Sequence, residues 1–217
     1  VNGVLTLSFP NERRLNAADL TYLAALADVC AQALARAQAL ESVTRVSNRF
    51  AFLAEASRQL AVSLNYEETL QAVAELAVPQ LADWCGIDLL ERDEIRAVAL
   101  AHVDPRKSAF ARNYRAMYPE PPDSGAGVSR VITSGESLLV SGITDDMLVA
   151  RARDERELAM LRELGMSAVL IVPLRAGGRV VGALSMIRSN PARPFTAGDV
   201  TLAKDLGGQA GTSLETA

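Results

Sequence analysis

The chain has 217 residues, with 22 Lys and Arg against 26 Asp and Glu, so its net charge is −4. Hydrophobic residues make up 49% of the sequence, a normal share for a folded protein. Because the charge is slightly acidic and no basic run occurs, we expect no binding to nucleic acid. No uninterrupted apolar stretch of about 18 residues and no secretory leader occur, so we expect a cytoplasmic location and no membrane contact.

Few residues are available for metal or redox chemistry. Cys30 and Cys85 are the two cysteines, too few for a disulfide framework, and His102 is the single histidine. The sequence shows no set of nucleophile, base and orienting residue, no glycine loop for phosphate and no metal-ligand spacing. We therefore expect no metal site and no catalysis by this chain, and the sequence identifies no cofactor.

The two ends of the chain resemble each other. Residues 3–7 are similar to residues 182–186, and residues 15–21 are similar to residues 195–201. Each end therefore predicts a strand, a turn and a helix with a polar N-cap.

Both of these helices are expected to have the same N-cap. Asn16 and Thr196 can each accept a hydrogen bond from the third helical amide, which belongs to an aspartate in both copies. We interpret residues 1–40 as the last strand and helix of one domain, joined to a linker helix, and residues 41–217 as a complete domain of the same type. Because the first strand is cut from its own sheet, we expect residues 1–10 to be disordered or to pair with the edge of a neighbouring chain.

A long helix is expected after the first cap. No glycine or proline occurs between Asn16 and Leu64, which predicts one very long helix or two helices that meet without a turn. The seam positions follow alternating steps of three and four in two sets that are one residue out of phase. The first set is Leu23, Leu26, Cys30, Ala33, Ala37 and Leu40, and the second is Val43, Val46, Phe50, Leu53, Ser57, Leu60 and Leu64. The pattern fits either a coiled coil or two amphipathic helices that each pack on their own core, and in both cases the segment is a mechanical joint.

Helices and strands are expected over the rest of the chain. Asn65, Asp104, Thr144 and Asp154 are expected N-caps. Two pairs of β-rich runs surround a charged turn and a glycine turn, which predicts two hairpins. The expected elements are helix 65–81, strands 84–90 and 95–103, a helix from 104 to 118, a short helix through 128–132, strand 138–143, a helical turn after 144, helix 154–164, strands 168–174 and 179–187, and helix 196–214.

Several side chains have expected roles in these elements. Asp154 and Glu157 have the spacing of a capping box, and the charged run from Asp145 to Arg156 is expected to be a solvated face. The helix that begins at Asp104 has an inner face of four bulky residues, Phe110, Tyr114, Met117 and Tyr118.

The last helix contains three glycines. They weaken it unless another helix packs closely against them. These glycines are Gly207, Gly208 and Gly211. An antiparallel sheet with helices on its faces is the most economical arrangement of all these elements.

Two groups of motifs resemble the GAF domain family. Residues 172–174, 180–184 and 195–199, with the glycine turn between the strands, resemble the C-terminal half of a GAF domain. Residues 127–136 and 138–140 resemble its middle helix and strand. The resemblance implies an α+β fold with about six antiparallel strands, the first and last helices on one face and a pocket under loops and short helices on the other.

Shorter motifs narrow the resemblance. Residues 81–85, 101–105 and 161–165 are similar to GAF domains of actinobacterial multidomain sensors, which end in a sporulation-type serine/threonine phosphatase or a histidine kinase. The resemblance implies a non-catalytic sensory module that forms a homodimer through its terminal helices and couples a small-molecule pocket to such an output enzyme. The pocket residues that it implies are Cys85, His102, Tyr114, Tyr118, Val128, Ile132 and Leu161.

The alternative function is a pure interaction module, in which bulky side chains fill the pocket and the helices only hold a dimer together. Asn190, Phe195 and Asp199 resemble part of a motif found in GAF domains that bind cyclic nucleotides. Pro191 and Val200 stand where that motif has Lys and Glu, so cyclic-nucleotide binding is disfavoured.

Haem, bilin and redox functions would each depend on a single residue of this sequence. His102 could bind haem, but a strand-end residue bonded to the backbone is the favoured interpretation. Cys85 could attach a bilin or sense oxidants, but a small buried side chain is favoured. A methionine sulfoxide reductase of this family uses several cysteines, and Cys85 has no second thiol in the domain to resolve a disulfide.

Overall fold

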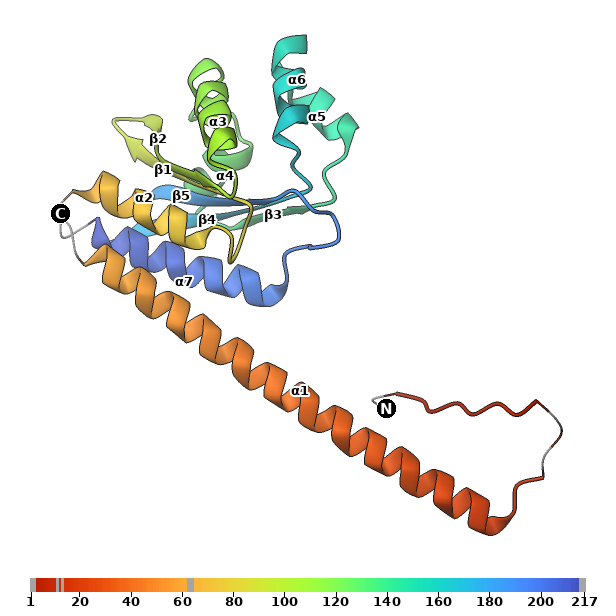
Figure 1. Cartoon of the computed structure of the whole chain (residues 1–217). Coiled ribbons are helices and arrows are strands. Elements are labelled where there is room, and N and C mark those ends of the chain that lie inside the picture. Colours follow the sequence, from red (N-terminus) through yellow and green to blue (C-terminus); the bar gives the residue numbers. More distant parts are fainter. Residues whose placement is uncertain (1–2, 11, 13, 62–64, 215–217) are drawn as a thin grey trace. The chain divides into compact units, whose positions relative to one another are not determined.

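The structure is a computed structural model that describes residues 3–10, 12, 14–61 and 65–214 (Figure 1). The chain divides into two compact units, Val1–Phe52 and Leu53–Ala217. Helix α1, Ala17–Leu60, is continuous over 44 residues, and its last eight belong to the second unit. The predicted long helix is therefore one helix over these residues, and positions 62–64 lie outside the described part.

The first unit begins with an extended segment and the cap of α1. Asp19 N donates to Asn16 Oδ1 over 2.9 Å, and Asn16 N donates to Asp19 Oδ2 over 3.0 Å, as the sequence predicts. The strand predicted at residues 3–7 does not form, because no strand of the described chain pairs with it. Residues 1–2 of the segment lie outside the described residues.

The surface of α1 carries many exposed apolar side chains, among them Leu26, Leu40, Val43, Val46 and Phe50. One 18-residue window of this helix reaches a mean hydropathy of 1.2, with none of it buried, so by length and composition α1 could span a bilayer. This is weak evidence for a membrane span, because the window also fits a soluble helix that pairs with another chain.

The second unit contains a five-stranded antiparallel sheet, in the order β2-β1-β5-β4-β3. Its strands are β1 Trp84–Glu91, β2 Glu94–His102, β3 Leu138–Ser141, β4 Ala168–Ala176 and β5 Arg179–Arg188. Both predicted hairpins are present, and Gly177 and Gly178 have the positive φ that the second turn requires. About six strands were expected, and the described residues form five.

Helices cover both faces of the sheet (Figure 1). The helices α2, Tyr66–Ala77, and α7, Ala197–Ser213, lie on one face. Four helices lie on the opposite face, and they are α3 Pro105–Met117, α4 Gly127–Ser134, α5 Asp145–Arg151 and α6 Glu155–Leu164.

The predicted N-caps Asn65, Asp104, Thr144 and Asp154 all accept hydrogen bonds from helical amides. The capping box predicted at Asp154 is incomplete. Asp154 accepts from the amide of Glu157, but the Glu157 carboxylate accepts from Arg153 N over 2.7 Å instead of bonding back to Asp154. Helix α2 ends at Ala77, four residues before the predicted end, because Pro79 restricts the backbone of the residue before it to extended conformations.

Gly207 and Gly211 of α7 pack closely against strand β4, whereas the sequence pointed to another helix as the partner that would offset their weakening effect. A Cβ on Gly207 would lie 3.1 Å from the carbonyl oxygen of Pro173 on β4, and one on Gly211 would clash with the backbone of Arg175. Gly208 faces open space. The glycines therefore allow α7 to lie close to β4.

Candidate functional site

The strand register forms the floor of a cavity on the face covered by α3 to α6. Leu138, Ile171, Ser185, Gly86 and Leu100 follow one another across the five strands as paired residues. Because side chains alternate between the faces of a strand, every second residue in each strand points to this same side. All five residues of this row line the cavity.

The neighbouring row completes the floor. Val140, Val169, Ile187 and Trp84 are paired across β3, β4, β5 and β1, and all four line the cavity. The cavity has a volume of about 880 Å³, which is large enough for a drug-sized molecule. Its remaining walls come from α3, α4, α5, α6 and the loops that join them, and they carry both apolar and charged side chains.

Four polar atoms at or beside the floor are buried and have no hydrogen-bond partner among the described residues. Asp88 accepts a hydrogen bond at Oδ1 from Nη2 of Arg115 on α3, and the Asp88 side chain is only 2% exposed. The other atoms of the pair, Asp88 Oδ2 and Arg115 Nη1, have no partner among the described residues. The same holds for Trp84 Nε1 and Ser185 Oγ. All four atoms belong to residues that line the cavity, and such groups are costly to bury unsatisfied.

Burial affects the ionisation of the floor carboxylate. It raises the pKa of Asp88 above the ordinary value, although the positive charge of Arg115 acts in the opposite direction. An ion-paired carboxylate with one vacant acceptor position is a good partner for a ligand N–H or O–H group.

A second polar cluster stands in the cavity wall. Tyr114 donates from its hydroxyl to Oε1 of Glu157 over 3.1 Å, and both side chains are buried. Arg151 pairs with Glu120 over 2.7 Å between nitrogen and oxygen. The charged run around Arg151 is exposed, as the sequence predicts. Arg151 and Arg153 of this run also line the cavity and pair with carboxylates.

Four of the seven residues predicted for the pocket line this cavity: Tyr114, Tyr118, Val128 and Leu161. Ile132 lies on α4 and packs in a buried cluster with Val128, Val131 and Ile171, and it does not line the cavity. Cys85 does not line it either, because it follows Trp84 in the strand and so faces the opposite side of the sheet. Cys85 is fully buried, and burial raises the pKa of its thiol to about 12.

His102 lies outside the large cavity. Its ring packs edge-on against Trp84 with centroids 4.0 Å apart, and its Nδ1 accepts from the amide of Asp104 over 2.6 Å. This is the backbone-bonded arrangement that the sequence favoured. Burial also lowers the pKa of His102, and the described residues contain no group of three potential metal ligands of the His, Cys, Asp and Glu types.

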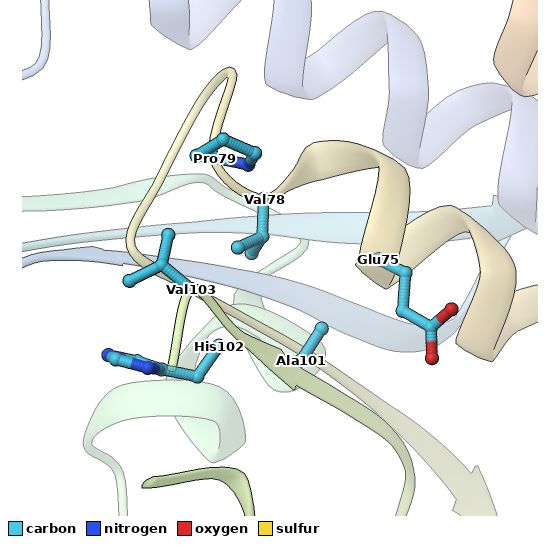
Figure 2. Close-up of a pocket in the computed structure, with 6 residues that line it drawn as sticks. All are labelled: Glu75, Val78, Pro79, Ala101, His102 and Val103. Atoms are coloured by element: carbon cyan, nitrogen blue, oxygen red, sulfur yellow. The ribbon is translucent and has the colours of Figure 1, made fainter. Parts of the chain in front are cut away.

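A smaller hollow of about 380 Å³ lies where α2 and β2 end (Figure 2). It is lined by Glu75, Val78, Pro79, Ala101, His102 and Val103. Figure 2 shows the His102 ring pointing away from the Glu75 carboxylate, so these two polar groups do not converge on one ligand position.

Sequence reasoning missed the polar floor. Trp84, Asp88, Arg115 and Ser185 were not predicted as site residues, although an aspartate in the middle of an apolar strand is an available signal. Arg115 was not identifiable, because its pairing with Asp88 depends on how α3 crosses the sheet.

The family model of the GAF domain matches residues 65–214. No curated protein matches the sequence. The chain is similar to the solved GAF domain of a phosphoenolpyruvate-protein phosphotransferase from Coxiella burnetii, with a TM-score of 0.57 and 16% identity over 78% of this chain and 94% of that one.

Two further solved structures contain small molecules. The phycocyanobilin-bound GAF domain of a cyanobacterial phytochrome has a TM-score of 0.54 and 15% identity, over 77% of this chain and 94% of that one. Free methionine-R-sulfoxide reductase from Neisseria meningitidis, in complex with its substrate, has a TM-score of 0.54 and 17% identity, over 76% of this chain and 86% of that one. At these identities the likeness shows the fold, and it confirms the predicted α+β class.

Proposed function

Because the chain belongs to the GAF family, whose members are sensory or regulatory modules of signalling proteins, we propose that it is a non-catalytic sensor of a small molecule. The molecule would bind in the cavity above the sheet. The binding state would then pass to an output enzyme through α1 and α7. Following the sequence resemblance, we propose a serine/threonine phosphatase or a histidine kinase as that enzyme, in a cytoplasmic protein.

The observation that carries this proposal is the polar floor. Four buried polar atoms that have no partner among the described residues belong to side chains that line one cavity of about 880 Å³. A cavity that only completes an apolar core has no use for such groups, since each one costs stability when left unsatisfied. A bound molecule with matching hydrogen-bonding groups would remove that cost.

Strand β4 supports a route from the cavity to α7. Val169 and Ile171 line the cavity, whereas the alternate residue Val172 lies under Gly207 of α7. Farther along the same helix, Gln209 accepts a hydrogen bond from Ser57 of α1 over 3.0 Å. A shift of β4 on ligand binding would therefore reach both terminal helices, which is the two-state behaviour that a sensor needs.

The second candidate function is a pure interaction module. It is favoured by the exposed apolar side chains of α1, which fit pairing with a second copy better than exposure to water. In this alternative the helix pairs in a homodimer, but the cavity takes no ligand.

A thiol-based reductase activity is disfavoured by the cysteine positions. Cys85 is the single cysteine of the unit Leu53–Ala217, and it lies on the face of the sheet away from the cavity. A reductase cycle that leaves a disulfide needs a second thiol within reach.

A native mass spectrum of the purified chain tests the proposal, because it reports subunit number and bound mass together. We expect a dimer that carries an additional small-molecule mass, and loss of that mass under collisional activation. A dimer of bare chains after refolding and incubation with cell extract metabolites would favour the interaction module. A monomer would contradict signalling through paired helices.

A further inference from the structure

We infer that the cavity floor recognises an uncharged molecule with a lactam or amide edge, in which an N–H group stands next to a carbonyl oxygen. The N–H would donate to Asp88 Oδ2, and the carbonyl would accept from Arg115 Nη1. The inference rests on the proposed function, since it names the chemical class that would occupy the same cavity.

The ion pair itself creates the recognition edge. Asp88 and Arg115 bond to each other through Oδ1 and Nη2 only. Asp88 Oδ2 and Arg115 Nη1 therefore have no hydrogen-bond partner among the described residues. One of these atoms accepts and the other donates. A ligand group that donates and accepts side by side would satisfy both with one planar edge.

The other floor groups extend this preference toward carbonyl-rich molecules. Trp84 Nε1 can only donate, and the Ser185 hydroxyl can donate or accept. With Arg115 Nη1, the floor therefore offers up to three donors against the one vacant acceptor of Asp88. A ligand with more acceptors than N–H groups fits this ratio best.

The charges at the cavity floor argue for an uncharged ligand. The three lining carboxylates, from Asp88, Glu120 and Glu157, each have an arginine partner at the cavity, namely Arg115, Arg151 and Arg153. The fourth lining arginine, Arg130, is exposed on α4 and is not part of the floor. A ligand anion would face Asp88, and a ligand cation would face Arg115. Either ion would also lose its hydration without gaining an unpaired counter-charge on the floor.

Gly86 makes room for the Arg115 side chain over β1. It lies between Trp84 and Asp88 on the same face of β1, and it is paired with Ser185. A Cβ on Gly86 would come within 3.1 Å of Arg115 Nη1, which is a tight contact. A glycine at this position therefore lets the Arg115 guanidinium lie beside Asp88.

The test uses Trp84 as the reporter, because it is the one tryptophan of the chain. Its indole N–H gives the single indole signal of a ¹H–¹⁵N spectrum, and Trp84 lines the cavity. Three probes of similar size are titrated: 2-quinolone, which has the lactam edge; N-methyl-2-quinolone, which lacks the N–H; and quinoline-2-carboxylate, which is an anion. We expect 2-quinolone to shift the indole signal and to bind at least about tenfold more tightly than the other two.

Substitutions locate the binding edge. Gly86→Ala leaves all charges in place and is expected to weaken 2-quinolone binding about tenfold or more, because the new methyl group crowds Arg115 Nη1. Asp88→Asn is expected to remove the preference for the N–H form. Ser185→Ala and Ser189→Ala are a matched pair, since both hydroxyls are buried with no partner in the described part of the chain but only Ser185 lines the cavity. We expect Ser189→Ala to leave probe affinity unchanged.

Two results would overturn the inference. Equal binding of the three probes, or tighter binding of the carboxylate, would reject the lactam edge and leave ligand binding in the cavity intact. No shift of the indole signal with any probe would reject the inference as well. The proposed sensor function is then judged separately by the native mass spectrum, which does not depend on these probes. Because Asp88→Asn could unfold the domain, Gly86→Ala provides the decisive comparison.

Discussion

The hydroxyl of Tyr114 on α3 donates a hydrogen bond to Oε1 of Glu157 on α6, with 3.1 Å between the two oxygens. The other oxygen of Glu157 accepts from Arg153 N over 2.7 Å. A buried carboxylate thus holds two helices and one loop in place at the wall of the cavity. The helices that cover the cavity are joined by this side-chain network in addition to their apolar contacts.

Removing the Tyr114 hydroxyl tests the strength of this link. Tyr114→Phe is expected to lower the free energy of unfolding by about 1–3 kcal/mol, because the Glu157 carboxylate loses a buried partner. Tyr114→Ala also removes the ring from the cluster around Trp84 and Leu161, and is expected to cost about 3–5 kcal/mol. Urea unfolding measures both. Tyr118→Phe is the matched control, since its hydroxyl bonds to Asp154 at the surface and should change stability by less than about 0.5 kcal/mol.

The same tyrosine predicts a pH dependence at high pH. Burial raises the pKa of Tyr114 to about 12 from its ordinary value of 10.0. Between these two values the unfolded chain loses the phenolic proton while the folded chain keeps it, so stability falls as pH rises. We expect unfolding free energies measured at pH 9, 10, 11 and 12 to fall less steeply for Tyr114→Phe than for the parent chain. Parallel curves for the two proteins would contradict the assignment.

Cys85 and Cys30 are expected to differ sharply in reactivity. Cys30 is exposed on α1, whereas Cys85 is buried and burial raises the pKa of its thiol to about 12. The thiolate is the reactive form, so alkylation of native Cys85 requires local or global unfolding. In the Cys30→Ser variant we expect no fast iodoacetamide labelling at neutral pH, and full labelling in urea. Fast native labelling of Cys85 would place it on an accessible surface.

Much of the fold follows from local signals in the sequence. The caps at Asn65, Asp104 and Thr196, the two hairpin turns and the apolar periodicity all act within a few residues, so they predict the element order well. The prediction of a strand at residues 3–7 was wrong because a strand needs a partner strand, and a local sequence pattern does not provide one.

The candidate site was only partly predictable for the same reason. Tyr114 and Leu161 line the cavity because their helices cover the sheet, which amphipathic patterns indicate. Cys85 and its neighbour Trp84 point to opposite faces of β1. Which of the two lines the cavity can be predicted only when it is known which face of the sheet carries the cavity. The pairing of Asp88 with Arg115 spans 27 residues and two elements, and no local pattern encodes it.

The contact between α7 and β4 gives the last prediction, with a control in the same helix. Gly211 faces the backbone of Arg175, and an added Cβ there would overlap the carbonyl oxygen and the amide nitrogen, neither of which can move without displacing the strand. Gly211→Ala is therefore expected to destabilise the domain by about 1–3 kcal/mol. Gly208 has no atom within 4 Å of an added Cβ, so Gly208→Ala should stabilise the domain by about 0.4–1 kcal/mol through its higher helix propensity and its smaller loss of backbone entropy.

If α7 lies against β4 as described, thermal and urea unfolding will show lower stability for Gly211→Ala and higher stability for Gly208→Ala. If both substitutions stabilise the domain, the close contact is absent and so is the route by which a shift of β4 would reach the last helix. If Gly211→Ala destabilises the domain and also weakens probe binding in the cavity on the far side of the sheet, the two faces are energetically coupled. Such coupling is reciprocal, so an occupied cavity should in turn change the stability of α7 against the sheet, measurable as altered hydrogen exchange of the α7 amides.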